Sequence, residues 1–184
     1  MIDHTWVQRH ADRYLDDFDG PTRELEDRLF AEVGPAAVKR GWLERKDLLQ
    51  IARWKANRSI GRVKTNNDEY VRRVTEVALK APDERALTLT SLFGVGIPMA
   101  SAILAVCFPE RYTVFDVNAV WALRQHGEIP NRRVDYGLYL SACRELANRL
   151  GPFKGHVSDL RALDRALWKY AQQNMKKRQG GRLG

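Results

Sequence analysis

The sequence feature that most constrains the fold is a glycine-bearing turn between two helix-forming segments. Residues 92–96 read LFGVG, and a helical pattern resumes at Pro98. Glycine adopts left-handed backbone conformations that other residues avoid, so Gly94 and Gly96 allow the chain to reverse sharply. Proline is accepted in the first turn of a helix, where its missing N–H costs little. The sequence therefore predicts two helices joined by this turn over about 84–107.

Most other segments are also predicted to be helical, because apolar residues recur at three- and four-residue spacing. Residues 112–115 carry the best strand signal and are too short to found a sheet. Asp83 is expected to cap the helix before the turn, and residues 34–41 (with Gly34-Pro35 and Gly41) are expected to form a loop. The predicted helices cover 5–18, 22–33, 45–58, 68–80, 84–92, 98–107, 116–125, 135–150 and 158–177.

This pattern predicts an all-α fold, a compact bundle of about eight to ten helices that contains a helix-hairpin-helix. The chain has 184 residues, which is enough for a domain with a real core. No linker, repeat or low-complexity stretch marks a hinge. We therefore expect residues 1–178 to form a single all-helical domain and residues 179–184 to be a flexible C-terminal end.

The charge balance favours polyanionic partners. The formal net charge is +8, from 31 basic and 23 acidic residues. Contacts with phosphate groups release counterions, which makes nucleic acids favourable partners of basic proteins. Positive charge gathers at 39–64, 132–133 and 176–182, whereas 1–34 are net acidic. Taken alone, this balance does not distinguish nucleic-acid binders from other basic proteins.

Several classes of protein are excluded or not expected. The sequence has no apolar run of membrane-spanning length, and its N-terminus has no secretory h-region. No membrane partner is expected, and the expected location is cytoplasmic and nucleoid-associated. Cys107 and Cys143 are the only cysteines, so an iron–sulfur cluster or a thiolate zinc site is excluded by count. No metal site is expected among the four scattered histidines. A monomer is expected.

The segment at 84–104, ERALTLTSLFGVGIPMASAIL, resembles the helix-hairpin-helix of a DNA glycosylase superfamily. That superfamily is named for this motif, a Gly/Pro-rich loop and an Asp, and it includes endonuclease III and the alkyladenine and adenine glycosylases. Ala100 stands four residues after Gly96, as in the family pattern, and Val114-Phe115-Asp116 matches its apolar-apolar-Asp. The resemblance is strong over about 84–124 and vague elsewhere.

The resemblance implies that the turn binds a DNA phosphate. In the family, backbone N–H groups of the turn hold the phosphate beside the damaged nucleotide, often with a monovalent cation held by loop carbonyls. This implies phosphate binding by Gly94, Val95, Gly96 and Pro98. The alternative reading is an ordinary αα-hairpin that needs glycine for its positive φ.

The resemblance also implies a catalytic role for Asp116. Its carboxylate would stabilise positive charge on the deoxyribose and orient or deprotonate water while an N-glycosidic bond breaks. The nucleotide must be flipped out, because this bond is inaccessible inside a duplex. Asp116 is equally explained as a helix N-cap, and the two roles are compatible because a capped carboxylate is a fixed one. Asn118 is a candidate for holding a water or a sugar oxygen, or for bonding the backbone in the first helical turn.

A second set of candidates precedes the hairpin and mixes an aromatic ring with cations. This set could stack a flipped base and contact phosphates. The alternative is a buried tryptophan with solvated basic neighbours. The candidates for this base pocket or DNA contact are Trp54, Lys55, Arg58, Arg62 and Lys64.

The sequence departs from the family at a position that matters for the expected chemistry. Bifunctional members carry a Lys where this chain has Pro98, which has no amine for a Schiff base. The expected function is therefore that of a monofunctional base excision repair glycosylase acting on double-stranded DNA. The alternative is a non-catalytic DNA-binding module with Asp116 as a structural cap. A third is an interaction protein without DNA affinity. The lesion, and the choice between DNA and RNA, stay open.

Overall fold

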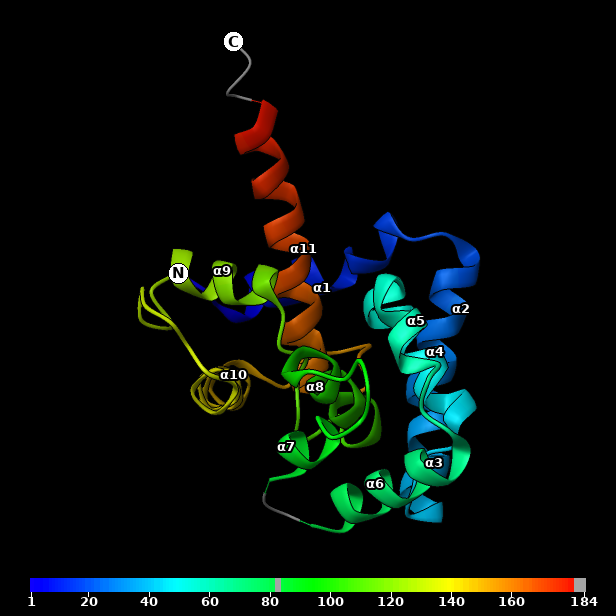
Figure 1. The fold of residues 1–184 in the computed structure, drawn as a ribbon. Helices are drawn as coiled ribbons and strands as arrows, with labels where there is room; N and C mark the ends of the chain where they lie inside the picture. The colour runs from blue at the N-terminus through cyan, green and yellow to red at the C-terminus, as the bar shows by residue number, and fades with distance from the viewer. Residues whose placement is uncertain (82–83, 181–184) are drawn as a thin grey trace. The chain divides into compact units, whose positions relative to one another are not determined.

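The computed structural model describes residues 1–81 and 84–180, with side chains through Asn174. The predicted cap Asp83 and the last four residues of the predicted flexible end lie outside the described residues. Within them the chain is all-helical, with 71% helix and no strands, as Figure 1 shows. The all-α prediction is confirmed.

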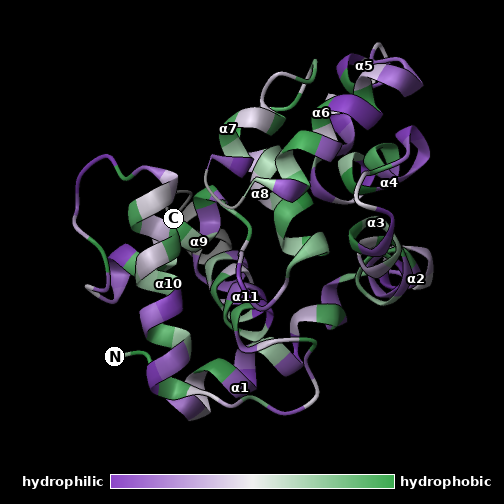
Figure 2. Ribbon diagram, turned by 90° about the horizontal axis from the view of Figure 1, so that it is seen from below, coloured by the Kyte–Doolittle hydropathy of each residue, from purple (hydrophilic) through white to green (hydrophobic). Residues whose placement is uncertain are grey.

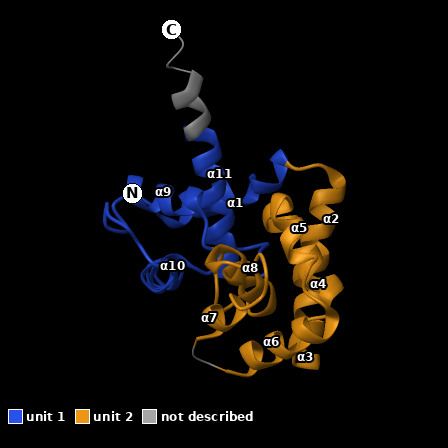
Figure 3. Cartoon of the chain, viewed as in Figure 1, with its two compact units in different colours: residues 1–17, 115–184 blue, residues 18–114 orange. Residues whose placement is uncertain are grey.

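The chain divides into two compact units within the region predicted as one domain. Unit 1 contains residues 1–17 and 115–184, and unit 2 contains residues 18–114, as Figure 3 shows. Unit 2 is therefore one continuous stretch of chain, whereas unit 1 is assembled from both sides of it.

Helix α8 is the centre of unit 2. The unit contains α2 (Gly20–Arg28), η2 (Leu29–Val33), α3 (Gly34–Arg40), α4 (Arg45–Ala56), η3 (Asn57–Ser59), α5 (Ile60–Val63), α6 (Asp68–Lys80), α7 (Arg85–Leu89) and α8 (Ile97–Cys107). Helix α8 packs against α3, α4 and α7. Its residues from Met99 to Cys107 are all buried, and hydrophobic colour dominates its ribbon in Figure 2. A helix that is apolar all round must be enclosed by others.

The loop predicted at residues 34–41 is wrong. Residues 34–40 form α3, because Pro35 is compatible with the first turn of a helix. The left-handed Gly41, with φ of 86°, ends the helix. Gly34 is required by packing, since a Cβ there would lie 2.0 Å from the carbonyl oxygen of Val106 in α8.

Helix α11 is the centre of unit 1. The unit contains α1 (His4–Asp12), η1 (Tyr14–Asp17), α9 (Val117–Gln125), α10 (Tyr136–Leu150) and α11 (Asp159–Gly180). Helix α11 packs against α1, α9 and α10. It carries buried charges that are paired: Arg161 with Asp164, and Lys169 with Asp17 at 2.9 Å. Within residues 1–81 and 84–180, no helix is long and apolar enough to cross a membrane.

Candidate functional site

The two glycines of the turn stand in different surroundings. Gly94 has φ of 76°, and a Cβ there would lie 2.8 Å from the Arg62 Cβ and 2.9 Å from the Val63 nitrogen. The fold therefore requires glycine at this position. Gly96 has φ of −91°, and the nearest neighbour of an added Cβ would be the Pro98 Cδ at 3.8 Å. Neither backbone conformation nor packing within the described chain requires glycine at position 96.

The turn leaves backbone donors unused at the start of α8. No side chain caps this helix. The N–H groups of Gly94, Gly96 and Ile97 donate to no acceptor among the described residues. The first N–H groups of a helix lack partners within it and carry partial positive charge. Gly96 and Pro98 are exposed, so solvent reaches these donors. Such an arrangement suits an anion.

Asn66, which sequence reasoning missed, holds the turn in place. Its Oδ1 accepts the Phe93 N–H at 2.9 Å, and its Nδ2 donates to the Phe93 carbonyl at 2.9 Å. Nδ2 also donates to the Val63 carbonyl at 2.8 Å, and the side chain is only 2% exposed. An amide side chain can pair with a peptide in both directions, as Asn66 does here. In the sequence, Asn66 lies between the helices predicted at 45–58 and 68–80, where no pattern marks it.

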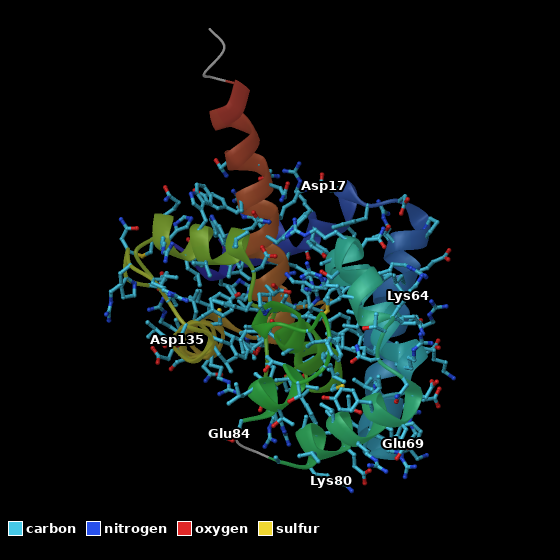
Figure 4. The ribbon with its side chains drawn as sticks, in the orientation of Figure 1. Asp17, Lys64, Glu69, Lys80, Glu84 and Asp135 are labelled. Atoms are coloured by element: carbon cyan, nitrogen blue, oxygen red, sulfur yellow. The ribbon has the colours of Figure 1, made fainter. Side chains whose placement is uncertain are left out.

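Arg62 is the predicted cation that the structure brings to the turn, since its Cβ lies against Gly94. Arg58, Arg62 and Lys64 are exposed, and Figure 4 shows Lys64 at the surface. The side chains of these three form no ion pair or hydrogen bond with another described residue. Lys55 is half-buried. The exposed cations are therefore available to a phosphate group.

The contacts of Trp54 are those of a packing residue. Its Nε1 donates to the buried Glu26 carboxylate at 3.0 Å, and its ring meets Phe30 edge-on at 5.6 Å. These contacts connect α4 with α2 and with the π-helical segment η2 that follows it. They agree with the alternative interpretation of Trp54 as a packing residue. A role for Trp54 in stacking a base stays a prediction.

Asp116 is the N-cap of α9. Its Oδ1 accepts the Asn118 N–H at 2.8 Å, and the side chain is half-buried. The cap reading of Asp116 is confirmed, and the carboxylate is therefore fixed. The Asn118 side chain forms no hydrogen bond with another described residue, so its amide is available for a water or a sugar oxygen.

Asp116 lies within electrostatic reach of the buried Tyr139 of α10. Burial raises the pKa of the Tyr139 phenol well above its usual value, and the negative charges of Asp164 and Asp116 act in the same direction. The preceding Phe115 packs against Tyr139 and Tyr136, with ring centroids 5.1 and 5.8 Å apart. Asp116 is thus anchored on the core of unit 1.

The turn and Asp116 belong to different units. Val114 is part of the core of unit 2, and Phe115 packs on the core of unit 1. Asp116 is therefore only two residues along the chain from unit 2, about 7 Å when extended. That the turn and the Asp116 carboxylate act on the same nucleotide stays a prediction.

A further feature that sequence reasoning missed is a hollow of about 300 Å³ in unit 2. The guanidinium groups of Arg40 and Arg72 lie over the Trp42 ring, 4.6 and 5.4 Å from its centroid. Three basic and three acidic residues line the hollow, so the net charge of its lining favours neither an anionic nor a cationic ligand. Its lining residues are Trp42, Glu44, Arg45, Lys46, Asp68, Glu69 and Arg72.

Within the described ranges, no three His, Cys, Asp or Glu side chains come together as a metal site. Comparisons with protein-family models, with curated proteins and with solved structures yield no significant match to this chain.

Proposed function

We propose that this protein grips the backbone of double-stranded DNA with the turn at 92–97 and acts as a monofunctional, glycosylase-like base excision repair enzyme. The observation that supports the grip best is Gly96. Its φ of −91° and the room for an added Cβ, whose nearest neighbour would be the Pro98 Cδ at 3.8 Å, give the fold no need for glycine. A phosphate that approaches the backbone closely does need it.

The grip would use the unpaired N–H groups of Gly94, Gly96 and Ile97, which lie within four residues of one another at the start of α8. Arg62, beside Gly94, would add a positive charge. The predicted donor Val95 is not available, because its N–H already donates to the Leu92 carbonyl at 3.1 Å. Pro98 lies in the first turn of α8 and has no N–H, so it would shape the site without donating to the phosphate. A monovalent cation would be held by carbonyls of the turn, of which that of Phe93 also accepts a hydrogen bond from Asn66.

The chemistry would be hydrolysis of an N-glycosidic bond by Asp116. As the bond between C1′ and the base nitrogen breaks, the carboxylate stabilises positive charge on the sugar. Water then bonds to C1′ as it gives up a proton to the carboxylate, and the carboxylate passes this proton on to the departing base, which regenerates the ionised Asp116. Pro98 has no amine, so this position cannot form a Schiff base with the product.

The grip is tested by comparing two alanine variants. Gly96→Ala should fold as stably as the wild type, because the fold has room for its Cβ, yet bind duplex DNA about tenfold or more weakly, as expected when hydrogen bonds to a charged group are lost. Gly94→Ala should lose stability instead. Gly20→Ala, where nothing lies within 4 Å of the added Cβ, is the control. Gly96→Ala with wild-type affinity would contradict the grip.

The chemistry is tested on duplexes that each carry one alkylated, deaminated or mismatched base. The wild type should release a free base, and Asp116→Asn should not, although an asparagine still caps α9. Asp135→Asn is the matched control, because Asp135 caps α10 in the same way, accepting the Leu138 N–H at 2.9 Å. Asp135→Asn should keep full activity.

The second candidate is a non-catalytic DNA-binding module, and the cap geometry of Asp116 favours it. The hydrogen bond from the Asn118 N–H gives the carboxylate a structural task without any reaction. This candidate predicts salt-dependent binding by the wild type and by Asp116→Asn alike, with no base released by either.

A further inference from the structure

Phe93 is a large apolar side chain that the fold holds out into solvent. It is 67% exposed, while its neighbours Leu92 and Val95 are buried. Its backbone is fixed on both sides, since Asn66 pairs with its N–H and with its carbonyl. The next residue, Gly94, is wedged against Arg62 and Val63. The position from which the ring projects is therefore set by the fold.

The surroundings of Phe93 are those of a nucleotide contact. An exposed aromatic face offers a stacking surface to a base. From Phe93 the chain continues into the unpaired N–H groups of Gly94, Gly96 and Ile97. Arg62, whose Cβ lies against Gly94, adds an exposed cation with no ion pair to a described residue. An aromatic ring, a cation and anion donors in one place match the base and the phosphate of one nucleotide.

We propose that Phe93 stacks on a base next to the phosphate held by the turn, and so makes the protein select nucleic acid that carries an unstacked nucleotide. This inference rests on the proposed grip of the turn. Stacking on Phe93 is possible only where a base is free of its own stack, as at an unpaired or flipped nucleotide. The stacking of Phe93 on a base involves no charge, so it adds affinity without adding salt dependence.

The experiment measures binding to two fluorescent DNA duplexes, one fully paired and one with a single unpaired nucleotide, over a range of salt concentrations. The wild type should bind the second duplex about fivefold or more tightly, as expected for one stacked base. Phe93→Ala should bind both duplexes equally, with an unchanged salt slope. Arg62→Ala should keep the preference and lower the slope by about 0.9.

Further variants keep the test independent of folding. Phe93→Leu keeps an apolar side chain without an aromatic face and should lose the preference, whereas Phe93→Tyr should retain it. Leu87→Ala removes a comparably exposed apolar side chain from α7, where Leu87 is 61% exposed, and should change nothing. A preference that survives in Phe93→Ala or Phe93→Leu overturns the stacking contact and leaves the grip standing. A wild type without affinity for either duplex overturns both.

Discussion

The Cα of Gly34 lies so close to Val106 that a Cβ added there would be 2.0 Å from the Val106 carbonyl oxygen and 2.8 Å from its carbonyl carbon. Both are backbone atoms of the buried helix α8, and they cannot move aside as a flexible side chain can. Helices α3 and α8 therefore meet backbone to backbone at this point.

Gly34→Ala should destabilise the protein by about 2 kcal/mol or more, because overpacking against backbone forces the helices apart. Urea unfolding measures the loss, with Gly20→Ala as the control, since a Cβ at Gly20 meets nothing within 4 Å. Equal unfolding midpoints for the two variants would show that α3 can move away from α8 without loss of stability.

Asn66→Ala should lower the free energy of unfolding by about 1–3 kcal/mol, because the Phe93 N–H loses its acceptor. Hydrogen exchange at the Phe93 amide should also become faster in this variant, which reports the local loss directly. Asn148→Ala, at an exposed position of α10, is the comparison. If Phe93 exchanges at the wild-type rate without Asn66, the turn does not depend on this side chain.

Asp164→Asn should lower the free energy of unfolding by about 3 kcal/mol or more, because it removes a carboxylate that is paired with the buried Arg161 guanidinium. Glu76→Gln removes the partner of the exposed Lys80 in α6 and should have little effect. Thermal unfolding of both variants measures the difference, and an Asp164→Asn variant as stable as the wild type would show that this ion pair contributes little to stability.

Stability should fall when the pH drops below about 6.5. Burial lowers the pKa of His10, His126 and His156 in the folded chain from the ordinary 6.5. The unfolded chain then binds more protons below pH 6.5, so the stability present above that pH is lost as the pH falls toward the folded pKa values. Urea midpoints at pH 7.5 and 5.5 measure this difference.

His126→Phe should reduce that pH dependence, because it keeps a ring against Trp6 and Tyr170 but removes a titrating group. The centroids of these rings lie 5.1 and 4.9 Å from that of His126. An unchanged pH dependence would assign the effect to other groups.

Cys107 should resist alkylation in the folded protein. Burial raises the pKa of its thiol to about 12, from an ordinary value of 9.0. At pH 8 this lowers the fraction of reactive thiolate by about 1,000-fold, and burial also blocks access. Mass spectrometry after iodoacetamide treatment should find the thiol labelled in urea and unlabelled in buffer. Rapid labelling in buffer would show that α8 opens.

The sequence predicted those elements of the fold that depend on neighbouring residues. Helix α6 begins and ends as predicted, because Asn67 caps it by accepting the Tyr70 N–H at 2.8 Å. Asp116 likewise caps α9 through a residue two positions away. Apolar periodicity and capping residues are local signals, so a single sequence contains them.

The features that the sequence did not predict depend on residues far apart in the chain. Residues 34–40 form a helix whose first glycine is explained only by Val106. Asn66 has its role through Phe93, which lies 27 residues later. No local pattern marks either pair. The same holds for the division into two units, because the boundary at Val114 and Phe115 has no linker composition.

The division of the chain into two units also affects the order in which its parts can fold during synthesis on the ribosome. Residues 18–114 are continuous, so unit 2 holds all of its helices once this stretch has emerged, and it is free to fold then. Helix α1 is made before unit 2, yet the helix against which it packs, α11, is made after it. The apolar face of α1 therefore stays uncovered until α11 has been made, and during that time it would offer a binding surface to a chaperone.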